Sequence, residues 1–83
     1  MEPEEVREEL EAHFAGSRAY ITRNEGSGKI VGDLVWDRFD GLEFLDRQRE
    51  LFNHLRAVYG PESAQISLIF TYTPEEYADL QAA

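Results

Sequence analysis

Apolar and polar positions recur along this chain with two periods, and each period predicts one type of element. Apolar residues spaced three and four apart predict helices over residues 3–14, 43–59 and 74–81. Runs rich in β-branched and aromatic residues, bounded by glycine, proline or charge, predict strands over residues 19–25, 30–37 and 65–72. The predicted order is therefore α-β-β-α-β-α.

The third strand runs almost directly into the last helix in the segment AQISLIFTYTPEEY, residues 64–77. Alternation predicts one face of this strand made by Ile66, Leu68 and Phe70. Thr73 and Glu76, with a proline between them, have the spacing of a capping box that starts a helix. This segment raises the question of what the polar Gln65 does at the start of the strand.

The connections between the strands predict how the sheet is built. The turn Gly26-Ser27-Gly28 joins the first two strands as an antiparallel hairpin. The helix over 43–59 is long enough for a right-handed crossover that places the third strand parallel to the second. We therefore expect an α+β fold, a three-stranded mixed sheet with helices on one face. Lys29 and Gln65 then lie close together, because their strands begin at the same end of the sheet.

Length and composition predict one domain, spanning residues 1–83, and limit its chemistry. The chain has no cysteine, which excludes disulfides, thiolate metal ligands and a cysteine nucleophile. It has no apolar run near the ~20 residues that a membrane span needs. The acidic N-terminal segment is unlike a secretory or mitochondrial leader, so we expect a cytoplasmic protein without membrane association.

No group of residues predicts an active site. The GSGK segment lacks the first glycine and the final hydroxyl of a phosphate-binding loop, since Arg23 and Ile30 occupy those positions. His13 and His54 lie on different predicted helices and are interpreted as partly covered residues at the edge of the core. No serine has a nucleophile motif around it. We therefore assign no catalytic residue and no metal ligand, and predict a protein that is not an enzyme.

Three arginines on the second helix are the candidates for basic contacts. Arg47, Arg49 and Arg56 are interpreted mainly as ion-pair partners for nearby acids such as Asp46 and Glu50, and alternatively as phosphate contacts. The net charge of −9 disfavours nucleic acid as a partner, because most of that affinity comes from neutralised phosphates.

Two segments closely resemble the signature of the BolA family. FDGLEFLDRQRELFNHL has its phenylalanine-acid-glycine turn and arginine-x-arginine helix, and AQISLIFTYTPEEY has its strand ending in Thr-Tyr-Thr-Pro-Glu-Glu plus an aromatic. The match extends from Phe39 to Tyr77, about half of the chain. The fold that this resemblance implies, similar to the type II KH arrangement, agrees with the one that periodicity predicts.

The resemblance implies a small adaptor that binds a monothiol-glutaredoxin-type partner in the handling of a [2Fe–2S] cluster. The family usually has a histidine ligand where this chain has Gln65, and a histidine or cysteine in the hairpin loop, where this chain has only Asn24 to Lys29. Gln48 also replaces the histidine between the two arginines. An amide oxygen is a poor iron ligand beside imidazole or thiolate. We therefore expect no intrinsic cofactor, and a cluster held mainly by the partner.

The expected partner-binding residues are those at the position of the family's cluster site: Gln65, Lys29, Gly28 and Ser27. The alternative function is a nucleic-acid-binding transcriptional regulator, which some BolA-like proteins are described to be, using the KH-like scaffold. KH domains clamp nucleic acid with a GxxG loop, and no such loop lies between helices in this sequence.

Overall fold

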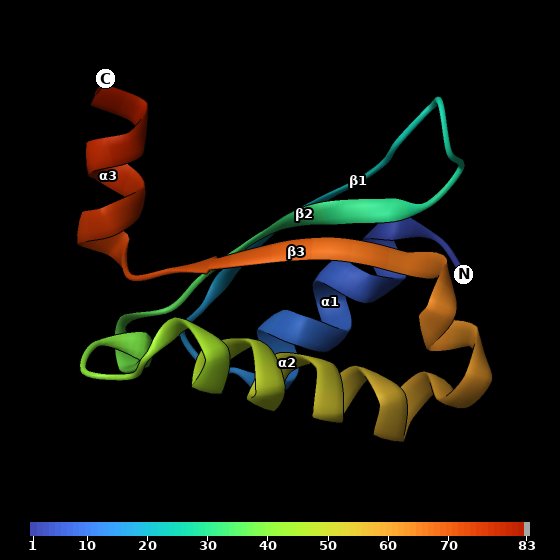
Figure 1. The fold of residues 1–83 in the computed structure, drawn as a ribbon, viewed down its shortest axis with the longest axis horizontal. Helices are drawn as coiled ribbons and strands as arrows, with labels where there is room; N and C mark the ends of the chain where they lie inside the picture. The colour runs from blue at the N-terminus through green and yellow to red at the C-terminus, as the bar shows by residue number, and fades with distance from the viewer. Residues whose placement is uncertain (83) are drawn as a thin grey trace.

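A computed structural model describes residues 1–82 of the chain, and its elements follow the predicted order (Figure 1). The helices, strands and two short 3₁₀ turns are α1 (Pro3–His13), β1 (Arg18–Arg23), β2 (Ile30–Val35), η1 (Asp37–Phe39), α2 (Phe44–Tyr59), η2 (Gly60–Gln65), β3 (Ile66–Tyr72) and α3 (Pro74–Ala82). Gln65 thus ends a 3₁₀ turn instead of opening the third strand. The other boundaries differ from the predicted ones by at most two residues, as is usual at fraying ends.

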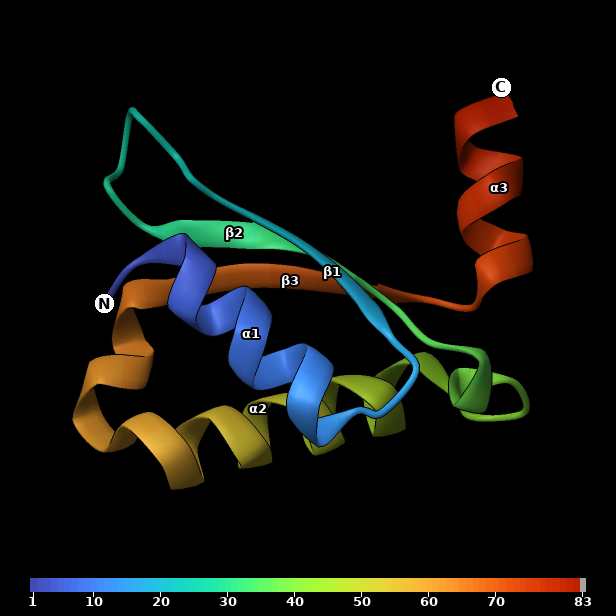
Figure 2. The same cartoon turned by 180° about the vertical axis from the view of Figure 1, so that it is seen from behind.

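The sheet has the predicted topology, with strand order β1-β2-β3. β1 and β2 are antiparallel, and β2 and β3 are parallel neighbours. Helices α1 and α2 cover one face of the sheet, and α3 rises from the end of β3 toward the opposite side (Figures 1 and 2). The predicted fold class, element order and mixed sheet are confirmed, but α3 does not join α1 and α2 on the one face where the helices were expected. Within residues 1–82, no helix combines the length and apolar character needed to cross a membrane.

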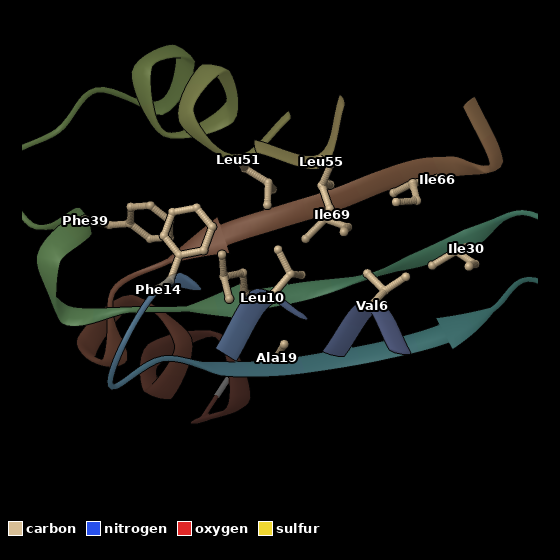
Figure 3. Close-up of a cluster of buried hydrophobic side chains, with 11 residues drawn as sticks. Val6, Leu10, Phe14, Ala19, Ile30, Phe39, Leu51, Leu55, Ile66 and Ile69 are labelled. Atoms are coloured by element: carbon tan, nitrogen blue, oxygen red, sulfur yellow. The ribbon is translucent and has the colours of Figure 1, made fainter. Parts of the chain in front are cut away.

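The core lies between the sheet and the two helices that cover it (Figure 3). Val6 and Leu10 project from α1, and Leu51 and Leu55 from α2, all four fully buried. Phe14, Ala19, Ile30, Leu34, Phe39, Ile66 and Ile69 complete this cluster. The four-residue spacing in both helices places one apolar stripe of each against the sheet, which is why the periodicity predicted them well.

The alternation predicted for the third strand is wrong in one respect. Ile66 pairs with Ile30, but the next pair along the two strands is Leu68 with Val31, so the register shifts between them. An extra residue in one strand reverses which side chains face the core. Ile66 and Ile69 therefore point inward, whereas Leu68 and Phe70 lie on the outer face and remain 44% and 42% exposed. The outer face of β3 is thus more apolar than the sequence predicted.

The buried side chain of Arg47 ties α2 to the end of β3 and to α3. Its Nε donates to the Leu42 carbonyl at 3.0 Å, and its guanidinium donates to the Thr71 carbonyl at 3.4 Å and to the Glu76 carboxylate at 2.7 Å. The same group lies over the ring of Phe39, 5.7 Å from its centroid. Three segments that are distant in sequence therefore converge on one charged group. Their hydrogen bonds and the ion pair offset the free-energy cost of burying this charge.

The capping box predicted at the start of α3 is confirmed and shares a carboxylate with Arg47. The Thr73 amide donates to Glu76 Oε1 at 2.8 Å, and the Glu76 amide donates to Thr73 Oγ1 at 3.2 Å. The hydrogen bond from Arg47, followed by that from the Thr73 backbone, lowers the pKa of Glu76 below its ordinary value. The two tyrosines that flank the cap, Tyr72 and Tyr77, have ring centroids 5.5 Å apart.

Replacing Glu76 by glutamine should destabilise the chain in a pH-dependent way. The pKa of Glu76 is lower in the folded chain than its ordinary 4.5, so its contribution is present at neutral pH and is lost as the pH falls through the folded value. We expect Glu76→Gln to lower the free energy of unfolding by about 1 kcal/mol at pH 7, because the carboxylate is half exposed. Urea denaturation at pH 7 and near pH 3 should show this difference disappearing in acid.

The matched control for this experiment is Glu75→Gln, which removes a charge from the same helical turn. Glu75 is exposed and contributes to the favourable interaction with the helix dipole, as Glu76 does, but it has no bond to Arg47. An equal loss in both variants at pH 7 would show that the dipole, and not the contact with Arg47, accounts for the effect.

A second prediction concerns Gly32, where β1 approaches β2 closely. A methyl group at this position would lie well inside contact distance of the Tyr20 carbonyl oxygen, and 2.9 Å from Cδ1 of Ile21. Because a backbone atom cannot move aside as a side chain does, Gly32→Ala should lower the free energy of unfolding by about 2 kcal/mol or more. Gly26→Ala is the control, since the nearest atom there is a side-chain oxygen at 3.3 Å. Equal stabilities of the two variants would contradict the prediction.

Candidate functional site

The structure brings Gln65 and the hairpin loop together at one end of the sheet, as the topology predicted. Ile66, directly after Gln65, pairs with Ile30, directly after Lys29. The Lys29 ammonium donates to the carbonyl of Ala64 at 3.0 Å, so it fastens the loop to the turn that leads into β3. Gln65 is exposed. This end of the sheet therefore exposes an amide, an ammonium group and a loop to solvent.

The hairpin loop is ordered by the side chain of Asn24. Its Oδ1 accepts hydrogen bonds from the amides of Gly26 and Ser27 at 2.9 and 3.0 Å, and its carbonyl accepts one from the Gly28 amide at 2.7 Å. Gly28 has a φ of 73°, which closes the turn back toward β2. The loop amides are thus used within the loop itself, and they do not form an open cradle for phosphate. Ser27 and Gly28 remain exposed for contact with a partner.

The residues at this end of the sheet do not fit as ligands of an iron–sulfur cluster. Such clusters are held by thiolates and in some proteins by imidazoles, whereas this surface presents the Gln65 amide, the Lys29 ammonium and the Ser27 hydroxyl. Among residues 1–82, no group of three histidine, aspartate or glutamate side chains is arranged to hold a metal ion. A partner bound here would have to supply every ligand of a cluster itself.

The two histidines lie together, which the sequence did not predict. Their rings stack with centroids 3.5 Å apart and planes 12° apart, where α1 meets α2. His54 Nε2 lies 2.8 Å from a carboxylate oxygen of Glu9, and His13 packs edge-on against Phe14. Stacked rings hold their in-plane lone pairs in parallel planes, so the two nitrogens cannot be directed at one ion. The pair joins the two helices at the edge of the core, which agrees with the structural role expected for each histidine.

The three candidate arginines are separated by the structure and do not form a basic surface. Arg47 is buried and is engaged by Glu76 and by backbone carbonyls. Arg49 lies 3.5 Å from Asp46, the ion pair that the sequence suggested, and Arg56 donates to Asn53 at 2.7 Å. Arg49 and Arg56 are exposed on α2, whereas Arg47 is turned inward.

A groove at the opposite end of β3 was missed by the sequence analysis. It has a volume of about 780 Å³ and lies between the start of α2, the end of β3 and one side of α3. Its apolar lining comes from Leu42, Phe44, Phe70, Tyr72 and Leu80. One signal in the sequence pointed to it: residues 42–45, LEFL, place three large apolar side chains around a single turn, and these cannot all face the core.

The outer face of the sheet next to this groove carries tyrosines around one acid. Tyr20 and Tyr77 stack with centroids 5.4 Å apart, and Tyr20 is opposite Asp33 in the sheet. Burial raises the pKa of Asp33, an effect that the Tyr77 hydroxyl opposes by hydrogen bonding. Burial and then the Asp33 charge raise the pKa of Tyr72 and of Tyr77. The rings contact one another directly, so they fix the base of α3 against the sheet.

A comparison with solved structures finds a similar overall fold in a bolA protein homologue from Coxiella burnetii. The two chains share 22% sequence identity and superpose with a TM-score of 0.73, over 94% of this chain and 97% of that one. No protein-family model and no curated protein matches the sequence. At this identity the likeness concerns the fold, and function has to be argued from the sites described above. The chain therefore has the BolA-like fold that its motifs implied.

Proposed function

We propose that this chain is a non-enzymatic BolA-like adaptor that binds a monothiol-glutaredoxin-type partner through the Gln65 end of its sheet, in the handling of [2Fe–2S] clusters. The observation that carries the proposal is the placement of Gln65 beside Lys29 and the hairpin loop. This is the position to which the family resemblance assigns cluster sharing. The BolA-like fold supports the proposal, because it gives the family motifs the structural context that they require.

In this proposal the chain contributes a recognition surface and no cluster ligand. The hydrogen bonds of Asn24 and the contact of Lys29 with Ala64 preorganise the loop, so little conformational entropy is lost on binding. The Gln65 amide has both a donor and an acceptor available for a partner's backbone. The partner keeps its own cluster ligands, and the adaptor would act by covering the cluster or by presenting the complex to a recipient.

The replacement of Gln65 by histidine tests this arrangement. Mixed with a cluster-loaded monothiol glutaredoxin, the wild-type chain should form a complex while the visible absorption spectrum stays that of the glutaredoxin. Gln65→His supplies an imidazole at the family's ligand position and should change that spectrum, since imidazole in place of thiolate alters the cluster's electronic structure. Gln81→His is the matched control, because Gln81 is an exposed glutamine on α3 and should leave the spectrum unchanged.

Two results would count against the proposal. If size-exclusion chromatography with light scattering shows no complex between the wild-type chain and the glutaredoxin, the partner assignment is wrong. If the wild-type chain, without the Gln65→His substitution, already changes the spectrum of the glutaredoxin cluster, a residue other than Gln65 enters the coordination shell. His13 and His54 then become the residues to substitute next.

For the alternative function we expect no tight binding of duplex DNA. The net charge is −9, and the buried Arg47 is not free to contact phosphates. Any association should weaken steeply with added salt and be absent at ~150 mM ionic strength, where the screening length is about 8 Å. Fluorescence anisotropy with labelled duplex DNA measures this. A sub-micromolar dissociation constant at that salt concentration would contradict this expectation and favour the regulator over the adaptor.

A further inference from the structure

The groove between α2, β3 and α3 gathers exposed apolar side chains from three separate elements. Four of its lining residues are large and apolar and yet well exposed: Leu42 (38%), Phe44 (53%), Phe70 (42%) and Leu80 (54%). Isolated exposed apolar residues are common, but a contiguous set around a concave surface marks an interaction site. The volume of about 780 Å³ is within the range of sites that enclose a ligand or the side chains of a peptide.

The charges around the groove are negative. Glu43, Glu76 and Asp79 contribute carboxylates to its lining, and Arg47 is the one basic residue there. Arg47 is only 8% exposed, and its guanidinium is already held by Glu76 and by the Thr71 carbonyl. A molecule in the groove therefore meets an apolar surface bordered by acids that no exposed cation neutralises within the lining. This charge pattern is complementary to apolar groups flanked by positive charge.

The edge of β3 at the groove and just before it is poorly suited to accept an additional strand. The carbonyl of Ile69 accepts a hydrogen bond from Gln48 at 2.9 Å, and the carbonyl of Thr71 accepts one from Arg47 at 3.4 Å. Strand addition depends on free main-chain groups along an edge, and these two acceptors are occupied by side chains of α2. A helical segment needs no main-chain partner and can insert its apolar face directly.

A second copy of this chain is a poor occupant for reasons of charge. In a symmetric contact each groove would face the same groove of the other copy, so the acidic border of one copy, which includes Glu43 and Asp79, would face the acidic border of the other. Each chain also carries a net charge of −9, so long-range repulsion opposes the encounter. The complementary occupant is a basic segment of another protein.

We propose that this groove binds an amphipathic helical segment of a partner protein, with apolar anchors flanked by lysine or arginine. The site is at the opposite end of β3 from Gln65 and does not depend on the glutaredoxin proposal. Phe44 of α2 and Leu80 of α3 contact the apolar face of the segment from opposite sides of the groove. Glu43 and Asp79 form ion pairs with its basic residues. The ion pair between Arg47 and Glu76 fixes the distance between α2 and α3, which form the two sides of the groove.

The test is a selection from a phage-displayed library of random peptides of about 16 residues, or roughly four helical turns. The full chain is the target, and the Phe44→Ser variant is used for counter-selection. Enriched peptides should carry apolar residues at helical spacing and an excess of lysine and arginine. Enrichment of acidic or strand-like peptides, or no enrichment after counter-selection, would overturn the proposal.

Binding of an enriched peptide is then measured by fluorescence anisotropy against matched pairs of variants. Phe44→Ser and Asp79→Lys should each weaken binding about tenfold or more, as loss of an anchor or of a charge partner does. Val58→Ser and Glu8→Lys make comparable changes, apolar to polar and acidic to basic, at exposed positions outside the groove and should have little effect. Circular dichroism establishes that each variant is folded, and Asp79→Lys removes no apolar side chain that folding could need.

Further outcomes discriminate among occupants and proposals. Equal weakening by Val58→Ser, or equal binding of a scrambled peptide with the same charge, would show non-specific attraction and overturn the proposal. A dimer in sedimentation that Phe44→Ser dissociates would make a second copy the occupant, which also overturns it. Phe44→Ser should leave binding to the glutaredoxin unchanged, so failure at this groove and failure at the Gln65 end can be told apart.

Discussion

The pairing of Arg47 with Glu76 is the interaction on which the layout of the C-terminal half depends. A guanidinium placed inside a small protein is costly unless its donors are used, and here they reach a loop carbonyl, a strand carbonyl and a carboxylate. The carboxylate in turn caps α3 through Thr73. α3 contributes no buried residue of its own, so its direction is set by this polar connection and by the tyrosine contacts at its base.

Because α3 is directed away from the helical layer, the sheet keeps one covered and one open face. The covered face follows from the apolar stripes of α1 and α2 (Figure 3). The open face carries exposed apolar side chains, since the register shift in β3 turns Leu68 and Phe70 outward. The exposed aromatic surface and the groove beside it are thus consequences of one extra residue in a strand and one charged pair.

The two ends of β3 present different chemistry. The Gln65 end is polar and preorganised by backbone and side-chain hydrogen bonds, and it lacks the ligand types that an iron–sulfur cluster takes. The Phe70 end is apolar with an acidic border. Surfaces at opposite ends of one strand can be occupied at the same time, so the two proposals together describe an adaptor that joins a glutaredoxin-type protein to a second, basic partner.

The sequence by itself determined the order of elements, the capping box at Thr73 and the closeness of Lys29 to Gln65, because these depend on periodicity, local hydrogen bonding and the handedness of crossovers. Only the tertiary structure decided the partner of Arg47, the stacking of His13 on His54 and the outward turn of Phe70. Each of these depends on residues distant in sequence meeting at one point, or on a register shift that leaves no local signal.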